Sequence, residues 1–125
     1  MALQDERVSG DVIGAAMEVH RALGPGLLES VYEECLCHEL SLRGCEFKRQ
    51  VEFPVMFKEL RIDGGMRLDM VVGDLVVVEL KSVEKLLPVH EAQLLTYLKL
   101  GRWKTGLLIN FNVALLKHGI VRRVV

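Results

Sequence analysis

The sequence has little of what marks a membrane or secreted protein. No apolar run approaches the roughly 20 residues that a membrane-spanning helix needs. The first ten residues are polar and contain no apolar stretch like that of a signal peptide. These absences exclude a membrane-spanning helix, and we expect a cytoplasmic protein without a membrane partner.

Cysteine is also scarce, because the chain has only 3 cysteines among 125 residues. This small, odd number does not fit the disulfide scaffold of a small secreted domain. A zinc site at Cys35, Cys37 and His38 would need a second pair of ligands, and the sequence offers no such pair. We therefore interpret Cys35, Cys37 and Cys45 as buried or half-buried thiols.

Excess charge, linkers and repeats are missing as well. The formal net charge is −1. This value excludes a general nucleic-acid coat protein, but not an enzyme that contacts nucleic acid through one local basic surface. No linker, low-complexity segment or internal repeat divides the chain, so we expect a single domain over residues 1–125. Aromatic residues make up only 6% of the sequence, so aliphatic side chains must fill its core.

What the chain does contain is a series of helical and strand patterns. Apolar residues at helical spacing predict helices at about 11–23, 26–43 and 89–100. Alternating or continuous apolar runs predict strands at 46–57, 66–72, 75–81, 105–111 and 119–125. This order predicts an α/β fold in which helices pack on a sheet.

Glycine, proline and small polar residues set the expected ends of these elements. Ser9 is a candidate N-cap of the first helix, and Gly24-Pro25 ends that helix. Pro54 marks the first strand as an edge strand, because proline cannot donate a ladder hydrogen bond. Turns are expected at Asp63-Gly64-Gly65 and at Gly73-Asp74.

Two charged residues lie in the most apolar strand, Leu75–Lys81 (LVVVELK). Its continuous apolar run predicts a central strand that is covered on both faces. Glu79 and Lys81 are two residues apart, so their side chains emerge on the same face. An unpaired buried charge costs several kcal/mol. Either the two side chains neutralise each other, or they line a cleft that holds a cation and an anionic substrate.

A second acid favours the cleft. Asp69 lies in the preceding strand, and a turn centred on Gly73-Asp74 folds the two strands antiparallel. This turn places Asp69 roughly opposite Val78, and therefore next to Glu79. Two carboxylates this close repel each other unless a cation lies nearby. Carboxylate oxygens suit Mg²⁺ or Mn²⁺, so we expect one of these ions as a cofactor.

Asp69 followed by Glu79-Leu80-Lys81 resembles the active-site motif of the PD-(D/E)XK nuclease superfamily. Residues 26–32 (GLLESVY) are similar to the signature of the GxxExxY family within it. Further stretches resemble that family in the same order: 19–26 (VHRALGPG), 90–98 (HEAQLLTYL) and 106–111 (GLLINF). The likeness covers most of the chain, although Leu68 stands where the motif has proline, a position that varies widely.

The resemblance implies a restriction-endonuclease-like core, with a central mixed sheet of about four to five strands flanked by helices. It implies that Asp69 and Glu79 bind the metal and that Glu29 reaches it directly or through water. Lys81 would position or polarise the attacking water, or steady the scissile phosphate. The resemblance therefore assigns Asp69, Glu79, Lys81 and Glu29 to catalysis.

Other residues are expected around the cleft. Gln93 and Tyr97 resemble a QxxxY element that flanks the site, and their i, i+4 spacing places both on one helix face. His20 is interpreted as a hydrogen-bonded histidine of the core or of the cleft rim, rather than as a ligand. Two positions stay open: His90 faces the cleft or the surface, and Tyr32 belongs to the site or to the core.

The resemblance implies a metal-dependent nuclease that hydrolyses phosphodiester bonds of nucleic acid, with DNA as the expected substrate. The alternative is a catalytically silent nucleic-acid- or protein-binding module with a nuclease fold. The intact Asp69, Glu79 and Lys81 disfavour that alternative. A homodimer is also open, because a second copy would double the surface that can hold a duplex.

Overall fold

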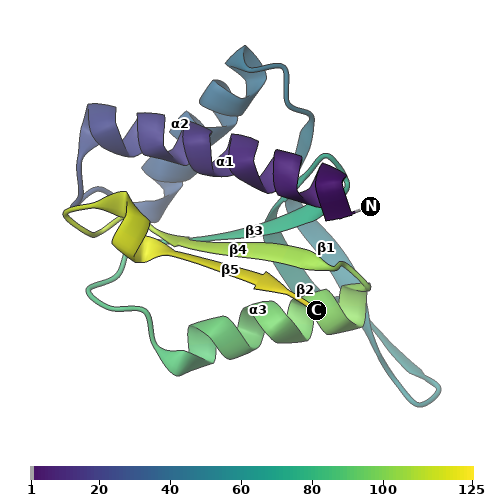
Figure 1. Ribbon diagram of the computed structural model, residues 1–125. Coiled ribbons are helices and arrows are strands. Elements are labelled where there is room, and N and C mark those ends of the chain that lie inside the picture. The colour runs from purple at the N-terminus through teal and green to yellow at the C-terminus, as the bar shows by residue number, and fades with distance from the viewer. Residues whose placement is uncertain (1) are drawn as a thin grey trace.

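Five strands form one sheet, with helices on both of its faces. The computed structural model describes residues 2–125, and Figure 1 shows α1 and α2 on one side of the sheet and α3 on the other. The elements in chain order are α1 (Ala2–Leu23), α2 (Glu29–Leu42), β1 (Phe47–Phe57), β2 (Leu60–Val72), β3 (Val76–Lys81), α3 (Pro88–Gly101), β4 (Thr105–Asn110), η1 (Leu116–Gly119) and β5 (Ile120–Val124). The strand order is β1-β2-β3-β4-β5, and only the pair β3–β4 is parallel among these neighbours. The expected α/β fold, with a mixed sheet of four to five strands flanked by helices, is confirmed.

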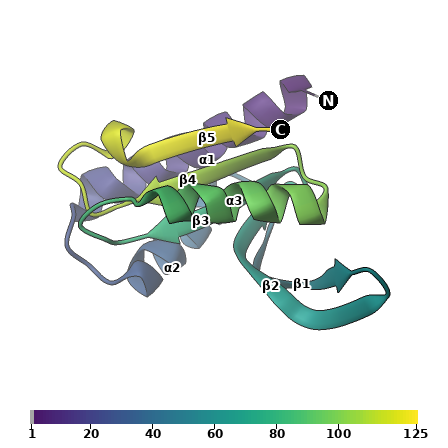
Figure 2. The ribbon, with the colours of Figure 1, turned by 90° about the horizontal axis from the view of Figure 1, so that it is seen from below.

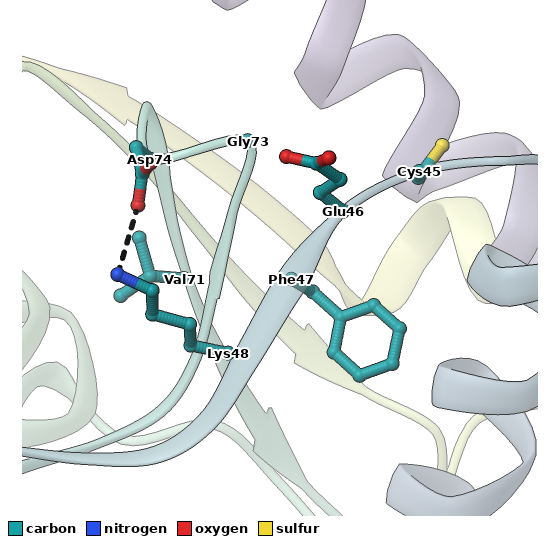
Figure 3. Close-up of a pocket in the computed structure, with 7 residues that line it drawn as sticks. All are labelled: Cys45, Glu46, Phe47, Lys48, Val71, Gly73 and Asp74. Carbon is teal, nitrogen blue, oxygen red and sulfur yellow. Dashed lines mark ion pairs between the residues drawn. The ribbon is translucent and has the colours of Figure 1, made fainter.

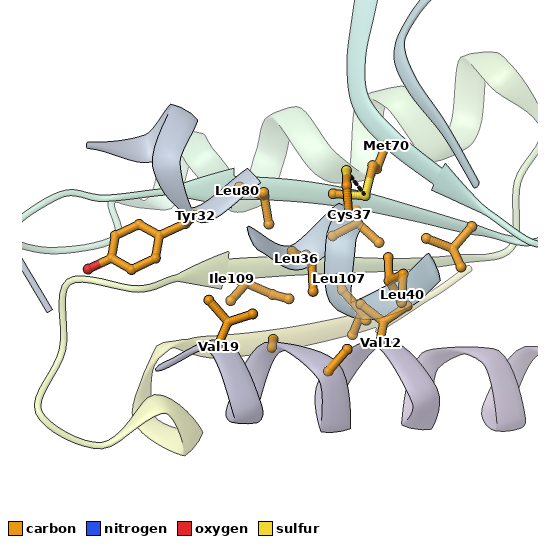
Figure 4. Packing of buried hydrophobic residues seen from close by; sticks show 14 of the residues in the cluster. Val12, Val19, Tyr32, Leu36, Cys37, Leu40, Met70, Leu80, Leu107 and Ile109 are labelled. Atoms are coloured by element: carbon orange, nitrogen blue, oxygen red, sulfur yellow. Dashed lines mark hydrogen bonds between the residues drawn. The ribbon is translucent and has the colours of Figure 1, made fainter. Parts of the chain in front are cut away.

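The central strand β3 is buried on both faces. Val76, Val78 and Leu80 pack into a cluster with residues of α1 and α2, part of which Figure 4 shows. Val77, which points the other way, packs into a second cluster with Leu94 of α3. This two-sided cover explains the continuous apolar run, so the prediction of a central strand is confirmed.

Helix α1 begins at Ala2, well before the predicted start, so the predicted N-cap at Ser9 was wrong. The Ser9 hydroxyl donates to the Glu6 carbonyl inside the helix (3.1 Å). The earlier turns are held by Asp5, which is buried and accepts a hydrogen bond from Thr105 of β4 (2.9 Å). Because this contact joins residues 100 positions apart, local periodicity does not reveal it.

The strands β1 and β2 form a long hairpin, and its tip projects from the body of the molecule (Figure 2). The chain reverses at Lys58-Glu59, where Lys58 has a left-handed φ of 55°. Asp63-Gly64-Gly65 therefore lies inside β2, and the predicted turn at this position was wrong. As a result β2 begins at Leu60 rather than at residue 66.

An irregularity in the hairpin explains why these glycines lie inside a strand. The register of the pairing with β2 shifts between Phe53 and Val55, on either side of Pro54, which has no amide hydrogen to donate. A Cβ atom at Gly65 would lie only 2.5 Å from the Val55 side chain, so glycine is the residue that fits there. The prediction that Pro54 marks an edge strand is confirmed, because β1 is the first strand of the sheet.

The bounds of the later helix and strands were predicted more accurately. The bounds of α3, β3, β4 and β5 lie within one residue of the predicted ones, although η1 was not predicted. The three cysteines are free thiols, as predicted, and burial raises the pKa of Cys37 to about 11. Among residues 2–125, no helix combines the length and the hydropathy that a membrane span requires.

A pocket lies at the end of the sheet where β2 turns into β3 (Figure 3). Its lining residues are Cys45, Glu46, Phe47, Lys48, Val71, Gly73 and Asp74. Lys48 and Asp74 form an ion pair there (3.5 Å), with both side chains exposed. Glu79 and Lys81 lie at the opposite end of β3, so this pocket is separate from the candidate site.

Candidate active site

The strands β2 and β3 separate at Asp69 and Glu79. Their ladder ends at the pair Met70–Val78. Beyond it, the Asp69 amide donates to Glu79 Oε2 (2.8 Å). In the same way, the Leu80 amide donates to Asp69 Oδ2 (2.8 Å). The carboxylates thus satisfy two amides at the point where the strands part, which accounts for a buried glutamate (5% exposed) in an apolar strand.

Asp69 lies level with Glu79 rather than opposite Val78. The connection between the two strands has three residues, 73–75, rather than two, and this moves every pair by one position. Met70 therefore pairs with Val78. The predicted register was therefore wrong by one residue. The two acids still meet, because Asp69 adjoins Met70 on β2 and Glu79 adjoins Val78 on β3.

Burial raises the pKa of both carboxyl groups. For Glu79, burial and the nearby Asp69 charge raise the pKa to about 8, although the Asp69 amide and the Lys81 charge act in the opposite direction. For Asp69, burial also raises the pKa, and the hydrogen bond from the Leu80 amide lowers it. The ionised form of each group is therefore disfavoured, and a divalent cation would stabilise both ionised forms.

Glu29 is the first residue of α2 and follows a loop whose shape Tyr32 fixes. Gly24 and Gly26 have left-handed φ angles of 75° and 97°, so α2 begins at Glu29 and not near Gly26 as predicted. The Tyr32 hydroxyl donates to the Gly24 carbonyl (2.6 Å) and accepts from the Leu27 amide (3.1 Å). Tyr32 is fully buried and stacks on Phe111 (ring centroids 4.5 Å apart). It therefore belongs to the core and shapes the loop before Glu29.

The same loop is tied to the end of β3. The Ser82 hydroxyl, directly after Lys81, donates to the Leu27 carbonyl (2.6 Å). Glu29 consequently lies near the site: burial and the Asp69 charge raise its pKa, and the Lys81 charge lowers it. Glu29 is exposed and lies within electrostatic range of the other two acids.

Removing the Tyr32 hydroxyl is expected to weaken the fold. In Tyr32→Phe the Leu27 amide and the Gly24 carbonyl lose their partner, so the free energy of unfolding should fall by about 1–3 kcal/mol. Urea denaturation followed by circular dichroism measures this change. Ser41→Ala, which removes an exposed hydroxyl from the same helix, is the matched control and should change stability by less than about 0.5 kcal/mol. Equal stability of Tyr32→Phe and the wild type would contradict this role of the hydroxyl.

Lys81 lies beside all three acids. Its charge lowers the pKa of each of them: Glu29, Asp69 and Glu79. Its side chain is half-exposed, and no ion pair among residues 2–125 involves it. The Glu79 carboxylate accepts its hydrogen bond from a backbone amide instead. This geometry favours the cleft over a closed Glu–Lys pair.

Helix α3 contributes Tyr97 to the same region. Burial raises the pKa of Tyr97, and the charges of Glu79 and Asp69 raise it further, so its hydroxyl lies within electrostatic reach of both acids. Gln93, one helical turn earlier, is exposed. Because residues four apart share a helix face, Gln93 lies on the same side of α3 as Tyr97.

Two histidines make hydrogen bonds with the backbone. His20 is buried (8% exposed), and its Nε2 is 2.8 Å from the Val113 carbonyl oxygen. His20 is thus hydrogen-bonded, and it also lines a surface pocket with Gly24 and Leu115. His90 Nδ1 accepts a hydrogen bond from the Leu87 amide (3.0 Å) at the start of α3. This is a local contact of a helix N-terminus, and His90 itself is half-buried.

Three residues near Asp69 were not predicted. Glu33 is buried (8% exposed), and its charge contributes to the raised pKa of Asp69. Arg49 Nη2 (2.8 Å) and Gln50 Nε2 (2.9 Å) both donate to the Glu33 carboxylate. The i, i+4 spacing of Glu29 and Glu33 signals a shared helix face. No local pattern marks Arg49 and Gln50, because their role depends on how β1 packs against α2.

The oxygen atoms of the site suit a hard divalent cation. Asp69 and Glu79 each use one carboxylate oxygen for a backbone amide, and the other lies outside these two hydrogen bonds. Within residues 2–125, no group of three or more His, Cys, Asp or Glu side chains is arranged so as to hold a metal ion. Mg²⁺ commonly uses one or two carboxylates and completes its shell with water. Asp69 and Glu79 therefore fit Mg²⁺ or Mn²⁺, and Glu29 lies within electrostatic range of Asp69.

Comparison with known proteins agrees with this geometry. A family model described as PD-(D/E)XK nuclease superfamily matches residues 6–124. Neither the curated proteins nor the solved structures gave a match. The matched range contains the whole sheet and every residue of the candidate site, and it supports a restriction-endonuclease-like fold.

Proposed function

Because this chain belongs to the PD-(D/E)XK nuclease superfamily, we propose that it is a metal-dependent nuclease of the GxxExxY family. In this proposal it hydrolyses phosphodiester bonds of DNA with Mg²⁺ or Mn²⁺ as the cofactor. The observation that carries the proposal is the pair of reciprocal hydrogen bonds between Asp69 and β3 and between Glu79 and β2. They hold one oxygen of each carboxylate at neighbouring positions of the two strands, and the Lys81 charge lowers the pKa of both groups.

The two carboxylates would hold the metal ion. A bound divalent cation lowers the pKa of a water ligand and stabilises charge on phosphate oxygens. The amides of Asp69 and Leu80 fix one oxygen of each carboxylate, so the ligands are oriented before the ion binds. Glu29 would add a third negative charge at the entrance of the site, where it can hold a metal-bound water.

Lys81 would act on the phosphate and on the attacking water. Its ammonium is a compact positive charge on a flexible stem, which suits contact with a phosphate oxygen where negative charge develops. The helix α3 closes the other side of the site, where the Tyr97 hydroxyl and the Gln93 carboxamide can contact the sugar–phosphate backbone. In this arrangement Glu79 would bind the metal ion, and Lys81 would contact the phosphate and the attacking water.

Metal binding is the first property to test. Free Mg²⁺ or Mn²⁺ at about ten times its Kd stabilises the folded protein by about 1.4 kcal/mol, so the Tm should rise by roughly 4–7 °C. Asp69→Asn should abolish this rise. Asp63→Asn is the matched control, because Asp63 is an exposed aspartate of the hairpin (81% exposed side chain), and it should keep the rise. A wild-type Tm that is indifferent to both metals would count against the proposal.

Cleavage is the second property. Purified protein is incubated with single-stranded, duplex and branched DNA and with RNA, each in Mg²⁺, Mn²⁺ or EDTA. We expect cutting of DNA that requires metal and stops in EDTA. Metal binding without cutting on any substrate would favour the catalytically silent binding module instead. Light scattering of the same samples tests for a homodimer, which would present two sites to one duplex.

A further inference from the structure

Gln50 has an unusual backbone for its place in the fold. It lies inside β1 with a left-handed φ of 49°. The other non-glycine residues of 2–125 with positive φ are Lys58, Asp74 and Arg102, and they lie in turns or at the C-cap of α3. A left-handed backbone is unfavourable for a residue with a Cβ atom. Such strain persists only where the surroundings enforce it, and it concentrates at functional sites.

The strained residue lies opposite Asp69. The pairs on either side of it are formed: Arg49–Met70 and Val51–Leu68. Between them, no pair joins Gln50 to Asp69. On the other side of β2, the last pair of the ladder with β3 is Met70–Val78, so Asp69 has no ladder partner there either. Asp69 is therefore released from regular pairing on both sides, which leaves its amide free to donate to Glu79.

The side chain of Gln50 is held by a carboxylate of α2. Its Nε2 atom donates to Glu33 Oε1 (2.9 Å). Glu33 Oε2 is itself held by Arg49, through Nη2 (2.8 Å) and Nε (3.1 Å). The Gln50 side chain also stabilises the ionised form of Asp69, whereas the Glu33 charge destabilises it. A neutral carboxamide at this position separates two negative charges and can donate to both.

We propose that Gln50 is a positioning residue that orients the Asp69 carboxylate, while Glu33 and Arg49 hold its carboxamide in place. The strained backbone of Gln50 lies at the one position of β1 that faces Asp69, where the regular pairing with β2 is interrupted. This inference rests on the proposed function, because it concerns a ligand of the proposed metal ion. Replacing a hydrogen-bonding partner of a metal ligand lowers metal affinity by about 10- to 100-fold.

The test is Gln50→Gly, which removes the carboxamide and relieves the backbone strain together. A positioning role predicts opposite effects on stability and on function. The Tm of the metal-free protein should stay equal or rise by about 2–4 °C. The Kd for Mn²⁺, measured by isothermal titration calorimetry, should rise about tenfold or more. The Mn²⁺ concentration for half-maximal cleavage should rise in parallel, while the rate at saturating Mn²⁺ stays within about threefold of the wild type.

Asp74→Gly is the matched control. It relieves a left-handed backbone (φ 55°) in the exposed turn between β2 and β3, so its Tm should also stay equal or rise, with an unchanged Kd for Mn²⁺. The inference is overturned if Gln50→Gly binds Mn²⁺ like the wild type, or if it loses stability and affinity together. A wild type that binds no Mn²⁺ at all would defeat the proposed function itself, and the role of Gln50 with it.

Discussion

Glu79→Gln is expected to abolish Mn²⁺ binding and to lower the cleavage rate by about 1000-fold or more. Glutamine keeps the length and shape of glutamate and can still accept the hydrogen bond from the Asp69 amide, which Glu79 Oε2 accepts in the wild type (2.8 Å). It removes only the charge that a metal ion requires. The loss therefore measures the ligand role of Glu79 rather than damage to the fold.

The same substitution should stabilise the metal-free protein at alkaline pH. The pKa of Glu79 is about 8 in the folded protein, above the usual value of 4.5, mainly because the group is buried. A raised carboxyl pKa means that its contribution to stability is fully present below pH 4.5 and is lost as the pH rises through 8. Each pH unit in this window costs the wild type up to about 1.4 kcal/mol. Glutamine does not titrate, so the variant escapes this loss.

Thermal unfolding in EDTA between pH 4.5 and pH 9 measures this difference. The Tm of Glu79→Gln should match that of the wild type at pH 4.5 and exceed it at pH 9. Addition of Mn²⁺ at pH 8 should raise the Tm of the wild type and leave that of Glu79→Gln unchanged, so the difference between them narrows, because only the wild type binds the ion. Glu59→Gln, at an exposed position of the hairpin turn, is the matched control and should follow the wild type throughout. A constant Tm difference between Glu79→Gln and the wild type at every pH would refute the buried-carboxyl account.

Lys81→Met is expected to lower the cleavage rate by roughly 1000-fold while the protein still binds Mn²⁺. Methionine keeps an unbranched side chain of similar length and removes the ammonium. The Lys81 charge lowers the pKa of Asp69 and Glu79, so its removal favours their protonated forms and weakens metal binding, but it also removes the repulsion between the ammonium and the cation. Because these two effects oppose each other, the Kd for Mn²⁺ should change little, and the loss is confined to the reaction.

Rates at saturating Mn²⁺ and calorimetric Kd values together test this separation. Lys117→Met, which removes an exposed lysine of η1, is the matched control and should cleave like the wild type. Lys81→Arg should also be slow, since a planar guanidinium does not replace a compact ammonium at a crowded site. Cleavage by Lys81→Met within about threefold of the wild type would remove Lys81 from the mechanism.

The two substitutions distinguish the nuclease from the alternative module. In a nuclease, Glu79→Gln loses both binding and cleavage, whereas Lys81→Met loses cleavage alone. In a silent binding module, the wild type already shows no cleavage, and neither substitution changes a rate. The contrast depends on the arrangement around β3, in which Glu79 is buried among backbone amides and Lys81 is half-exposed at the strand end.

Much of the fold was readable from the sequence because it depends on local patterns. The apolar run of β3 predicted a central strand, and that strand is buried on both faces. The spacing of Glu79 and Lys81 predicted a shared face, because side chains alternate along a strand. The chain also reverses just after Gly73, so Asp69 and Glu79 meet as predicted. Each of these features is set within a few residues of chain.

Local patterns failed where distant segments decide the structure. The early turns of α1 depend on the contact of Asp5 with Thr105, and the turn of the hairpin depends on how Val55 packs against Gly65. In both cases packing determined the structure, and the local signal did not. These signals were the Ser9 cap and the Asp63-Gly64-Gly65 turn. Burial and hydrogen bonds to distant partners outweigh the small preferences of a cap or a turn residue.

The same distinction between local patterns and distant packing applies to the candidate site. The sequence by itself determined which acids and which lysine lie on β2, on β3 and at the start of α2, because spacing and strand alternation fix the face of each side chain. Only the tertiary structure decided how Asp69 and Glu79 exchange hydrogen bonds with backbone amides, and how Glu33 and Gln50 reach Asp69. These contacts arise where β2 and β3 separate and where Gln50 interrupts the pairing of β1 with β2, and the position of both irregularities depends on the packing of the whole sheet.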